Sequence, residues 1–292
     1  MLSHLKNLLL TQGIELCAPI KLSHCVITRP YKLSKHGFSD TDALTAFMLA
    51  VPYLTRQGER NLSAYASPRD YHLYFRRLFD GILPLLEASY PQYCFVGFAD
   101  DSPIEERSAA AMAGLGVLGD NGMLITDQYS SFVFLGEIIT DAPVDVPSPL
   151  PIRRCEGCGK CKTVCPMGEL GVCLSALTQK KGELLAEEKS AILQYGSAWG
   201  CDLCQNACPH TQKAIESGSI YTSVPFFEEK TIPYLTLALL DSMSDGEFAE
   251  RAYSWRGRDT VRRNLTILER GEDRENQTEP DGNVSAQEGT LC

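Results

Sequence analysis

Seven of the twelve cysteines in this 292-residue chain form two runs with matching spacing, and an eighth lies between the runs. Both runs contain the pattern Cys-x2-Cys-x3-Cys-Pro, and the first run has one additional cysteine at its start. The first run is Cys155, Cys158, Cys161 and Cys165, the second is Cys201, Cys204 and Cys208, and Cys173 lies between them. Thiolates at such short, repeated spacing are typical ligands of metal ions and iron–sulfur clusters.

This spacing is that of a bacterial two-cluster ferredoxin, in which the cysteine before the proline ligates the opposite cluster. The rule predicts two 4Fe–4S clusters: cluster one on Cys155, Cys158, Cys161 and Cys208, and cluster two on Cys165, Cys173, Cys201 and Cys204. Two zinc sites are the alternative, because Cys-x2-Cys pairs also bind tetrahedral zinc. Zinc requires neither the third cysteine nor the doubled Cys-Pro. A disulfide framework is disfavoured by the ligand-like grouping.

The composition indicates a folded protein. The chain is 44% hydrophobic, long enough for one large and one small domain, and has no apolar stretch that could span a bilayer. We therefore expect a cytoplasmic location and no membrane partner. The net charge of −10 argues against general nucleic-acid binding. The four remaining cysteines are predicted to be free thiols: Cys17, Cys25, Cys94 and Cys292.

The pattern of apolar residues predicts α/β (α+β) structure before the cysteines and helices after them. We expect a first domain over 1–150, a ferredoxin-like domain over 151–225, C-terminal helices over 226–270 and a disordered acidic tail over 271–292. Helices are predicted at Ser39–Tyr53, Tyr71–Ser89, Glu105–Gly114, Ala186–Tyr195, Phe226–Asp241 and Gly246–Arg270. Strands are predicted at Tyr93–Phe98, Asn121–Thr126 and Ser131–Ile139.

Two further features have more than one interpretation. Asp100 lies where a predicted strand meets a predicted helix, a position that suits both a helix N-cap and a site residue. A segment near Trp255 concentrates positive charge and could bind phosphates, or it could be a solvated helix end. Its arginines are Arg256, Arg258, Arg262 and Arg263.

The order of motifs along the chain resembles that of the epoxyqueuosine reductase family, whose members complete queuosine in tRNA. The resemblance runs from about Asn61 to Leu268. It comprises Asn61–His72, the Asp-x-x-Pro-x-x-acid-Arg motif of Asp100–Arg107, Leu135–Thr140 and the double cysteine motif. It implies a cobalamin-binding domain, two 4Fe–4S clusters, a tRNA substrate held in part by the four arginines, and an external low-potential electron donor.

The resemblance also implies a mechanism. Reduction of an epoxide to an alkene consumes two electrons and two protons, and no side chain supplies such electrons. Cob(I)alamin would attack the epoxide, and Asp100 would protonate the departing oxygen. For this, burial against corrin and substrate would have to raise the pKa of Asp100. The residues implied to border the cobalamin are Tyr65, Arg69, Tyr71, His72, Asp100, Asn121 and Ser175.

The chain departs from the family pattern at Asp120, where a lysine is usual, in a short N-terminal part, and in lacking a C-terminal helical repeat. Binding of tRNA would then depend more on the arginine-rich segment. Two alternative functions differ in class. One is a corrinoid iron–sulfur reductase of another substrate, like the reductive dehalogenases. The other is a plain ferredoxin-type electron-transfer protein, which would leave the first 150 residues unexplained.

Overall fold

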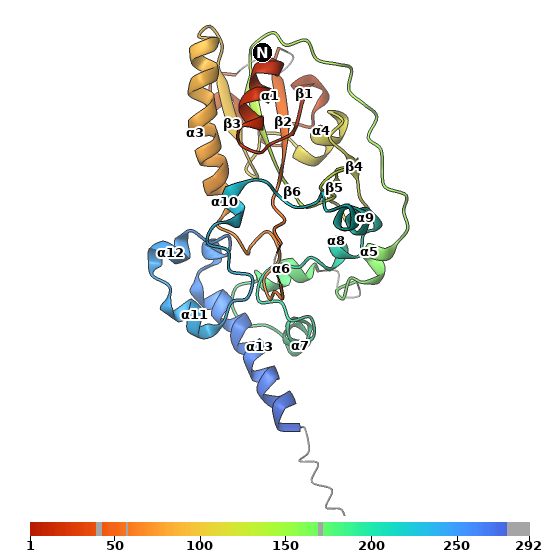
Figure 1. The fold of residues 1–292 in the computed structure, drawn as a ribbon, viewed down its shortest axis with the longest axis vertical. Helices are drawn as coiled ribbons and strands as arrows, with labels where there is room; N and C mark the ends of the chain where they lie inside the picture. The colour runs from red at the N-terminus through yellow and green to blue at the C-terminus, as the bar shows by residue number, and fades with distance from the viewer. Residues whose placement is uncertain (39–42, 57, 169–171, 279–292) are drawn as a thin grey trace, which may run out of the picture.

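The computed structural model describes residues 1–38, 43–56, 58–168 and 172–278, with side chains as far as residue 271. The upper half of the molecule in Figure 1 is built on a four-stranded sheet whose neighbouring strands are all antiparallel. The strand order is β1 (Leu16–Lys21), β2 (Thr45–Pro52), β6 (Val133–Thr140) and β3 (Phe95–Phe98). The expected mixture of helix and sheet is confirmed, and the pairing makes it an α+β fold.

Every residue of β2 is buried, because the strand lies between two apolar cores. Alternate side chains enter different cores. One core contains Phe47, Leu49 and Val51, and the other contains Ala46, Met48 and Ala50. A strand buried on both faces is a continuous apolar run without period-two alternation, so periodicity cannot distinguish it from a helix. The helix predicted over Ser39–Tyr53 is therefore wrong at β2, and Ser39–Asp42 lie outside the described residues.

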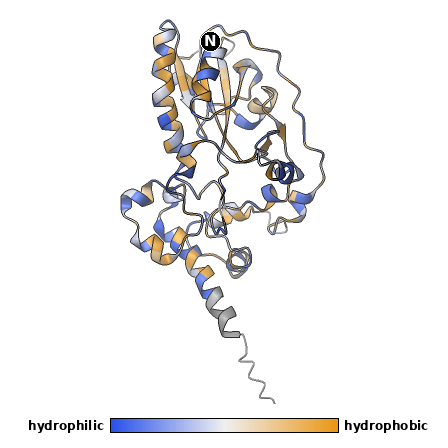
Figure 2. Ribbon diagram, in the orientation of Figure 1, coloured by the Kyte–Doolittle hydropathy of each residue, from blue (hydrophilic) through white to orange (hydrophobic). Residues whose placement is uncertain are grey.

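Helices cover both faces of this sheet (Figures 1 and 2). One face packs against α1 (Leu2–Leu10) and α3 (Tyr71–Ser89). The other packs against η1 (Leu22–His24), α2 (Pro30–Lys35) and α4 (Glu106–Met112). The bounds of α3 are those predicted, because Asp70 caps an amphipathic run by accepting a hydrogen bond from the His72 N–H.

The remaining predicted strands are confirmed with smaller bounds. β3 lies within the run predicted from Tyr93, and β6 overlaps the run predicted from Ser131 but ends one residue later. β5 (Leu124–Ile125) lies within the run predicted from Asn121 and forms a short hairpin with β4 (Val117–Leu118). Two glycines let aromatic rings of α3 approach the sheet. A Cβ at Gly97 would lie 2.4 Å from Cγ of Phe79, and one at Gly136 would lie 2.5 Å from Cε1 of Phe75.

An extended connection runs from the end of β6 down one side of the molecule to the first cysteine run (Figure 1). Short helices then alternate with loops: α5 (Lys160–Thr163), α6 (Leu174–Thr178), α7 (Ala186–Gln194), α8 (Leu203–Asn206) and α9 (Pro209–Ser217). The predicted helix at Ala186–Tyr195 is confirmed as α7.

The C-terminal helices are more broken than predicted. The region Phe226–Asp241 contains α10 (Pro225–Glu228) and α11 (Leu237–Ser242), because Pro233 and the Thr236 cap interrupt it. The region Gly246–Arg270 is divided into α12 (Asp245–Ala249), η2 (Ser254–Arg256) and α13 (Arg258–Thr278). Helix α13 continues eight residues into the segment expected to be disordered, whose remainder lies outside the described residues.

A third apolar core joins the cysteine-bearing segment to the C-terminal helices. Trp199 and Tyr253 are its largest fully buried side chains, and Leu174, Ile192 and Leu265 pack around them. The expected units 151–225 and 226–270 therefore share one core. No helix in the described part of the chain is long and apolar enough to cross a membrane.

The close approach of Phe79 to the sheet makes Gly97 sensitive to substitution. Gly97→Ala should lower the thermal unfolding midpoint, because the added methyl overlaps the ring. Gly81→Ala, on the exposed face of α3 with open space around it, should raise stability by about 0.5–1 kcal/mol. Circular dichroism of both variants checks this, and an unchanged midpoint for Gly97→Ala would contradict it.

Candidate functional site

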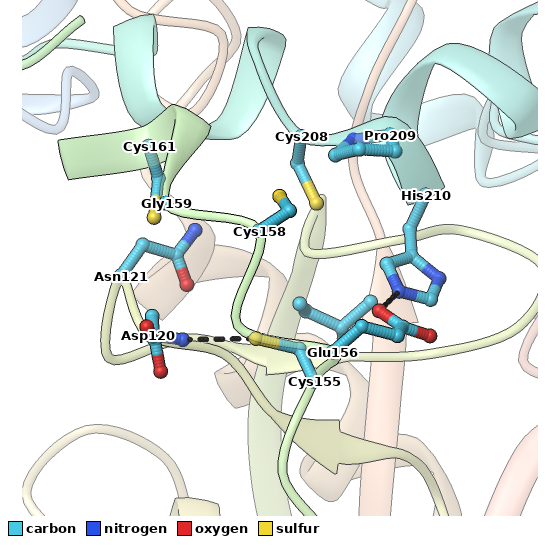
Figure 3. A pocket seen from close by; sticks show the side chains of 11 residues that line it. Asp120, Asn121, Cys155, Glu156, Cys158, Gly159, Cys161, Cys208, Pro209 and His210 are labelled. Atoms are coloured by element: carbon cyan, nitrogen blue, oxygen red, sulfur yellow. Dashed lines mark hydrogen bonds and ion pairs between the residues drawn. The ribbon is translucent and has the colours of Figure 1, made fainter. Parts of the chain in front are cut away.

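Four cysteines from the two distant runs line one cavity (Figure 3). They are the set predicted for cluster one: Cys155, Cys158, Cys161 and Cys208. Gly157 and Gly159 adopt left-handed backbone conformations, with φ of 66° and 75°, and fold the first run into a tight loop. Cys208 occupies the N-cap position of α9, whose first residue is Pro209, and makes no side-chain cap hydrogen bond, so this helix start presents the fourth thiol.

The second set of thiols also lies together. Cys165 and Cys173 both act electrostatically on Cys201 and Cys204, and Cys161 of the first set also acts on Cys204, so the two sets adjoin. Burial, reinforced by the neighbouring thiols, raises the pKa of Cys204 to about 11, so this thiol would become a metal ligand only with the help of a bound cation's positive charge. Among the described residues, no three His, Cys, Asp or Glu side chains converge on a single metal ion.

Polar contacts surround the first cavity. The Asp120 N–H donates to Sγ of Cys155 at 3.4 Å, a contact that stabilises a thiolate. The Asp120 carboxylate pairs with Nζ of Lys162 at 2.8 Å. A lysine therefore lies at this loop although the loop itself carries an aspartate. Asn121 also lines the cavity, and its buried Nδ2 has no hydrogen-bond partner in the protein.

Asp100 lies on a turn and does not cap the following helix. Its φ is 62°, and the Asp101 N–H donates to the Ala99 carbonyl at 2.7 Å across it. Such three-residue turns are rare and strained, and strain of this kind gathers at functional sites. Glu105 caps α4 by accepting from the Ser108 N–H, which excludes the cap interpretation of Asp100. The side chain of Asp100 is 65% exposed.

His72 lies between two carboxylates. Its Nδ1 is 2.8 Å from Oδ1 of Asp70, and its Nε2 is 3.5 Å from Oδ2 of Asp100. The hydrogen bond to Asp100, with that to Asp70, raises the pKa of His72 to about 9. The same hydrogen bond holds the pKa of Asp100 below its ordinary value. Without corrin or substrate, this arrangement favours a charged Asp100 beside a protonated His72, and the rise in the Asp100 pKa expected on covering the site stays a prediction.

Two carboxyl groups lie behind the Asp100 turn, that of Glu137 buried and that of Glu106 half-buried. Glu137 is fully buried on β6, opposite Phe98, and the Ser102 hydroxyl donates to its Oε1 at 2.5 Å. Glu106 accepts from the Asp100 N–H at 3.3 Å. Burial raises the pKa of both glutamates. The charge of Asp100 raises the pKa of Glu106 further, and the charge of Glu106 raises that of Glu137. A proton shared between them gives the otherwise unpartnered Oε2 of Glu137 a partner.

The other residues implied to contact cobalamin fall into separate groups. Tyr71 stacks on His72 with ring centroids 4.1 Å apart. Tyr65 accepts from the indole N–H of Trp199 at 2.9 Å, and Gln179 contacts both Tyr65 and Ser175. The structure thus joins Tyr71, His72 and Asp100 in one group, joins Tyr65 to Ser175 in another, and places Asn121 at the cysteine cavity.

Arg69 lies apart from these groups. Its guanidinium forms a 2.7 Å ion pair with Glu229 and stacks on Phe226, with the side chain almost fully buried. Asp70, Glu137 and Trp199 were not identified as site residues. Asp70 had a detectable signal, since it directly precedes a predicted amphipathic helix. Glu137 and Trp199 act through partners far away in the sequence.

No family model matches the chain. An epoxyqueuosine reductase from Gloeobacter violaceus is 34% identical over 213 residues, covering 68% of this chain and 66% of that protein. An epoxyqueuosine reductase from Lactococcus garvieae is 30% identical over 245 residues, covering 77% and 68%. The chain belongs to the epoxyqueuosine reductase family. It spans 66% of the Gloeobacter relative and 58% of the Bacillus subtilis one.

Solved structures of epoxyqueuosine reductases share the fold. One, in complex with an epoxyqueuosine-modified tRNA-Tyr stem loop, has a TM-score of 0.70 at 23% identity, covering 91% of this chain and 80% of that chain. Another, from Bacillus subtilis, has a TM-score of 0.68 and its catalytic aspartate loop swung out of the active site. The mixed helix–sheet fold of this chain is therefore that of the family.

The crossed arrangement of thiols predicts which irons a substitution removes. Cys208→Ala should lower the iron content from about eight to about four per chain, because one cluster loses a ligand and the other keeps all four. Cys94→Ala, on an edge of the sheet, is the matched control and should keep the full content. Iron analysis with electron paramagnetic resonance after anaerobic reconstitution checks this. Full iron content in Cys208→Ala would contradict the ligand set.

Proposed function

We propose that this chain reduces epoxyqueuosine to queuosine in tRNA, with Asp100 as the proton donor. The observation that carries the proposal is the strained, exposed turn at Asp100, joined to His72 in a chain that also gathers eight cysteines in two groups. Membership of the epoxyqueuosine reductase family supports the choice of substrate.

The reaction requires two electrons and two protons for each epoxide. Two 4Fe–4S clusters on the eight cysteines would accept electrons singly from an external low-potential donor. Cobalamin, when bound, would supply these electrons as a pair to an epoxide carbon. Residues that fit such a cofactor are Tyr71, the Tyr65–Ser175 group and Asn121, whose unpartnered amide nitrogen requires an acceptor. Arg69, held by Glu229, would support this wall from behind.

The protein's own contribution is to position an acid. The backbone at Asp100 is fixed by a turn and by the hydrogen bond of its N–H to Glu106, and its carboxylate pairs with His72. Its side chain reaches open space, where a substrate oxygen can approach. Covering the site with substrate would remove water from Asp100 and favour its neutral form, which is the form that donates a proton.

Substitution of neighbouring aspartates separates the acid from its surroundings. Asp100→Asn should retain both clusters and cobalamin but lose at least about 100-fold in turnover, since general acid catalysis contributes about 10²–10⁴-fold. Asp101→Asn should change turnover little, because Asp101 is exposed and forms surface ion pairs with Arg29 and Lys32. Equal losses in both variants would contradict the assignment.

The measurement is a reaction of the reconstituted enzyme with tRNA bearing epoxyqueuosine, under anaerobic conditions. Nucleoside mass spectrometry should report the loss of one oxygen, dependent on cobalamin and reductant. A preparation with full iron and cobalamin content that leaves the nucleoside unchanged would overturn the proposed substrate.

The four arginines predicted to hold tRNA differ in their partners. Arg258 donates to the carbonyls of Leu240 and Met243 at the end of α11, and Arg263 donates to those of Lys180 and Gly182. Arg262 pairs with Asp241 at 2.6 Å. Arg256 stacks on Trp255, which is 60% exposed. The Trp255–Arg256 pair is the part of this segment best suited to contact RNA.

Binding and folding effects should therefore separate along the arginine-rich segment. Arg256→Ala should weaken tRNA binding and reduce the slope of log affinity against log salt by about one. Arg258→Ala should mainly lower the unfolding midpoint, because it leaves helix-end carbonyls without a donor. Filter binding at several salt concentrations, together with thermal unfolding, checks both. Equal effects on binding and stability in both variants would contradict the separation.

A further inference from the structure

A single acid cannot complete epoxide reduction without being reloaded. Removal of the epoxide oxygen as water breaks two C–O bonds, forms a C=C bond and consumes two protons. If Asp100 delivers both, it must regain a proton while the substrate still covers the site and limits access of water. The proposal that follows rests on the proposed function and concerns the source of that proton.

The arrangement around His72 has the geometry of a proton-transfer chain. Nε2 of His72 points to Oδ2 of Asp100 at 3.5 Å, while Nδ1 is held by Asp70 at 2.8 Å. Asp70 also accepts from the His72 backbone N–H at 2.9 Å, so one carboxylate fixes both the helix start and the ring. The imidazole is half-exposed, which lets it exchange protons with solvent.

We propose that His72 reloads Asp100 with a proton during turnover and that Asp70 is the positioning residue for its ring. His72 releases the Nε2 proton to Oδ2 of Asp100. Asp100 passes that proton to the departing oxygen. His72 then takes a replacement from water, so no proton is created or lost. The two electrons come from the cofactors of the proposed function.

The charges that face His72 favour its protonated form. On α3 itself, Asp70 is a hydrogen-bond partner and Tyr71 stacks on the ring. From the turn after β3 comes Asp100, and Glu106 of α4 lies behind that turn. Arg29, from the segment before α2, also attracts the negative charge of Asp100 and so lowers the pKa of that carboxyl together with His72. The N-terminus of α3 also disfavours a cation, so the two aspartates must outweigh both effects.

The Glu106–Glu137 pair, unlike His72, does not contact the Asp100 carboxyl. It contacts the backbone N–H of Asp100 and not its carboxyl, and Glu137 is closed off from solvent. A proton shared there stabilises the turn and has no described route to Oδ2. His72 is the described histidine that contacts Asp100, and it also reaches water.

The first test measures the protonation of His72 without any turnover. Diethyl pyrocarbonate modifies neutral imidazole, so the pH dependence of carbethoxylation of the His72 peptide, followed by mass spectrometry, reports its pKa. The wild-type value should be near 9. In Asp100→Asn the rate at pH 7 should rise at least about tenfold, since one pKa unit changes the neutral fraction tenfold. An unchanged rate would overturn the link between His72 and Asp100.

The second test compares pH–rate profiles of the loaded enzyme on modified tRNA. The raised pKa keeps His72 protonated below about 9, so the wild-type rate should be flat from about pH 6.5 to 8.5 and fall above that. In His72→Asn, Asp100 must take protons directly from solvent. The turnover rate of the His72→Asn variant should therefore fall about tenfold for each pH unit over the same range. Imidazole added to His72→Ala should restore activity.

His36→Asn is the matched control, because His36 is an exposed histidine packed on Phe98. It should keep the wild-type profile, and all variants should keep wild-type iron content and unfolding midpoint. Parallel profiles for wild type and His72→Asn, or the absence of imidazole rescue, would overturn the proposal. A wild-type enzyme inactive on this tRNA would instead overturn the proposed function. The carbethoxylation experiment would still test the link between His72 and Asp100, because it requires no turnover.

Discussion

The lower half of the molecule depends on one constraint: each group of thiols draws its members from both cysteine runs. Cys208 must reach the loop of Cys155, Cys158 and Cys161, and Cys165 must reach Cys201 and Cys204. Helices α5 and α8 therefore lie in contact. The core around Trp199 holds this loop-rich region together from below.

A second constraint acts at the upper edge of the same region, where acidic groups outnumber the charges that can neutralise them. Asp70 and Asp100 share His72, and burial raises the pKa of both Glu106 and Glu137. The fold therefore gathers groups at this edge whose tendencies to hold a proton differ from those of free side chains. Such an arrangement suits a site whose chemistry consumes protons in a fixed number.

The sequence predicted features that depend on neighbouring residues. Prediction failed for features that depend on contacts with residues far away in the sequence. Helix α3 has a capping aspartate and an amphipathic run, so both of its ends were predicted. The first cysteine set was predicted from spacing alone, and the four thiols do line one cavity. Strand β2 was mistaken for a helix because both of its faces are buried. Arg258 and Arg263 suggested phosphate binding, yet their acceptors are main-chain carbonyls that no residue type reveals.

The completion of the upper core has a consequence for synthesis. The sheet has all four strands once residue 140 has left the ribosome, but the core on its α3 face also contains Phe226 and Phe227. At ribosomal rates the intervening residues take roughly ten seconds to appear. All eight cysteines emerge within that interval, while part of the apolar face is still uncovered. Final closure of the first core therefore waits for Phe226 and Phe227, and a pause in synthesis over this interval would leave the nascent chain exposed to aggregation.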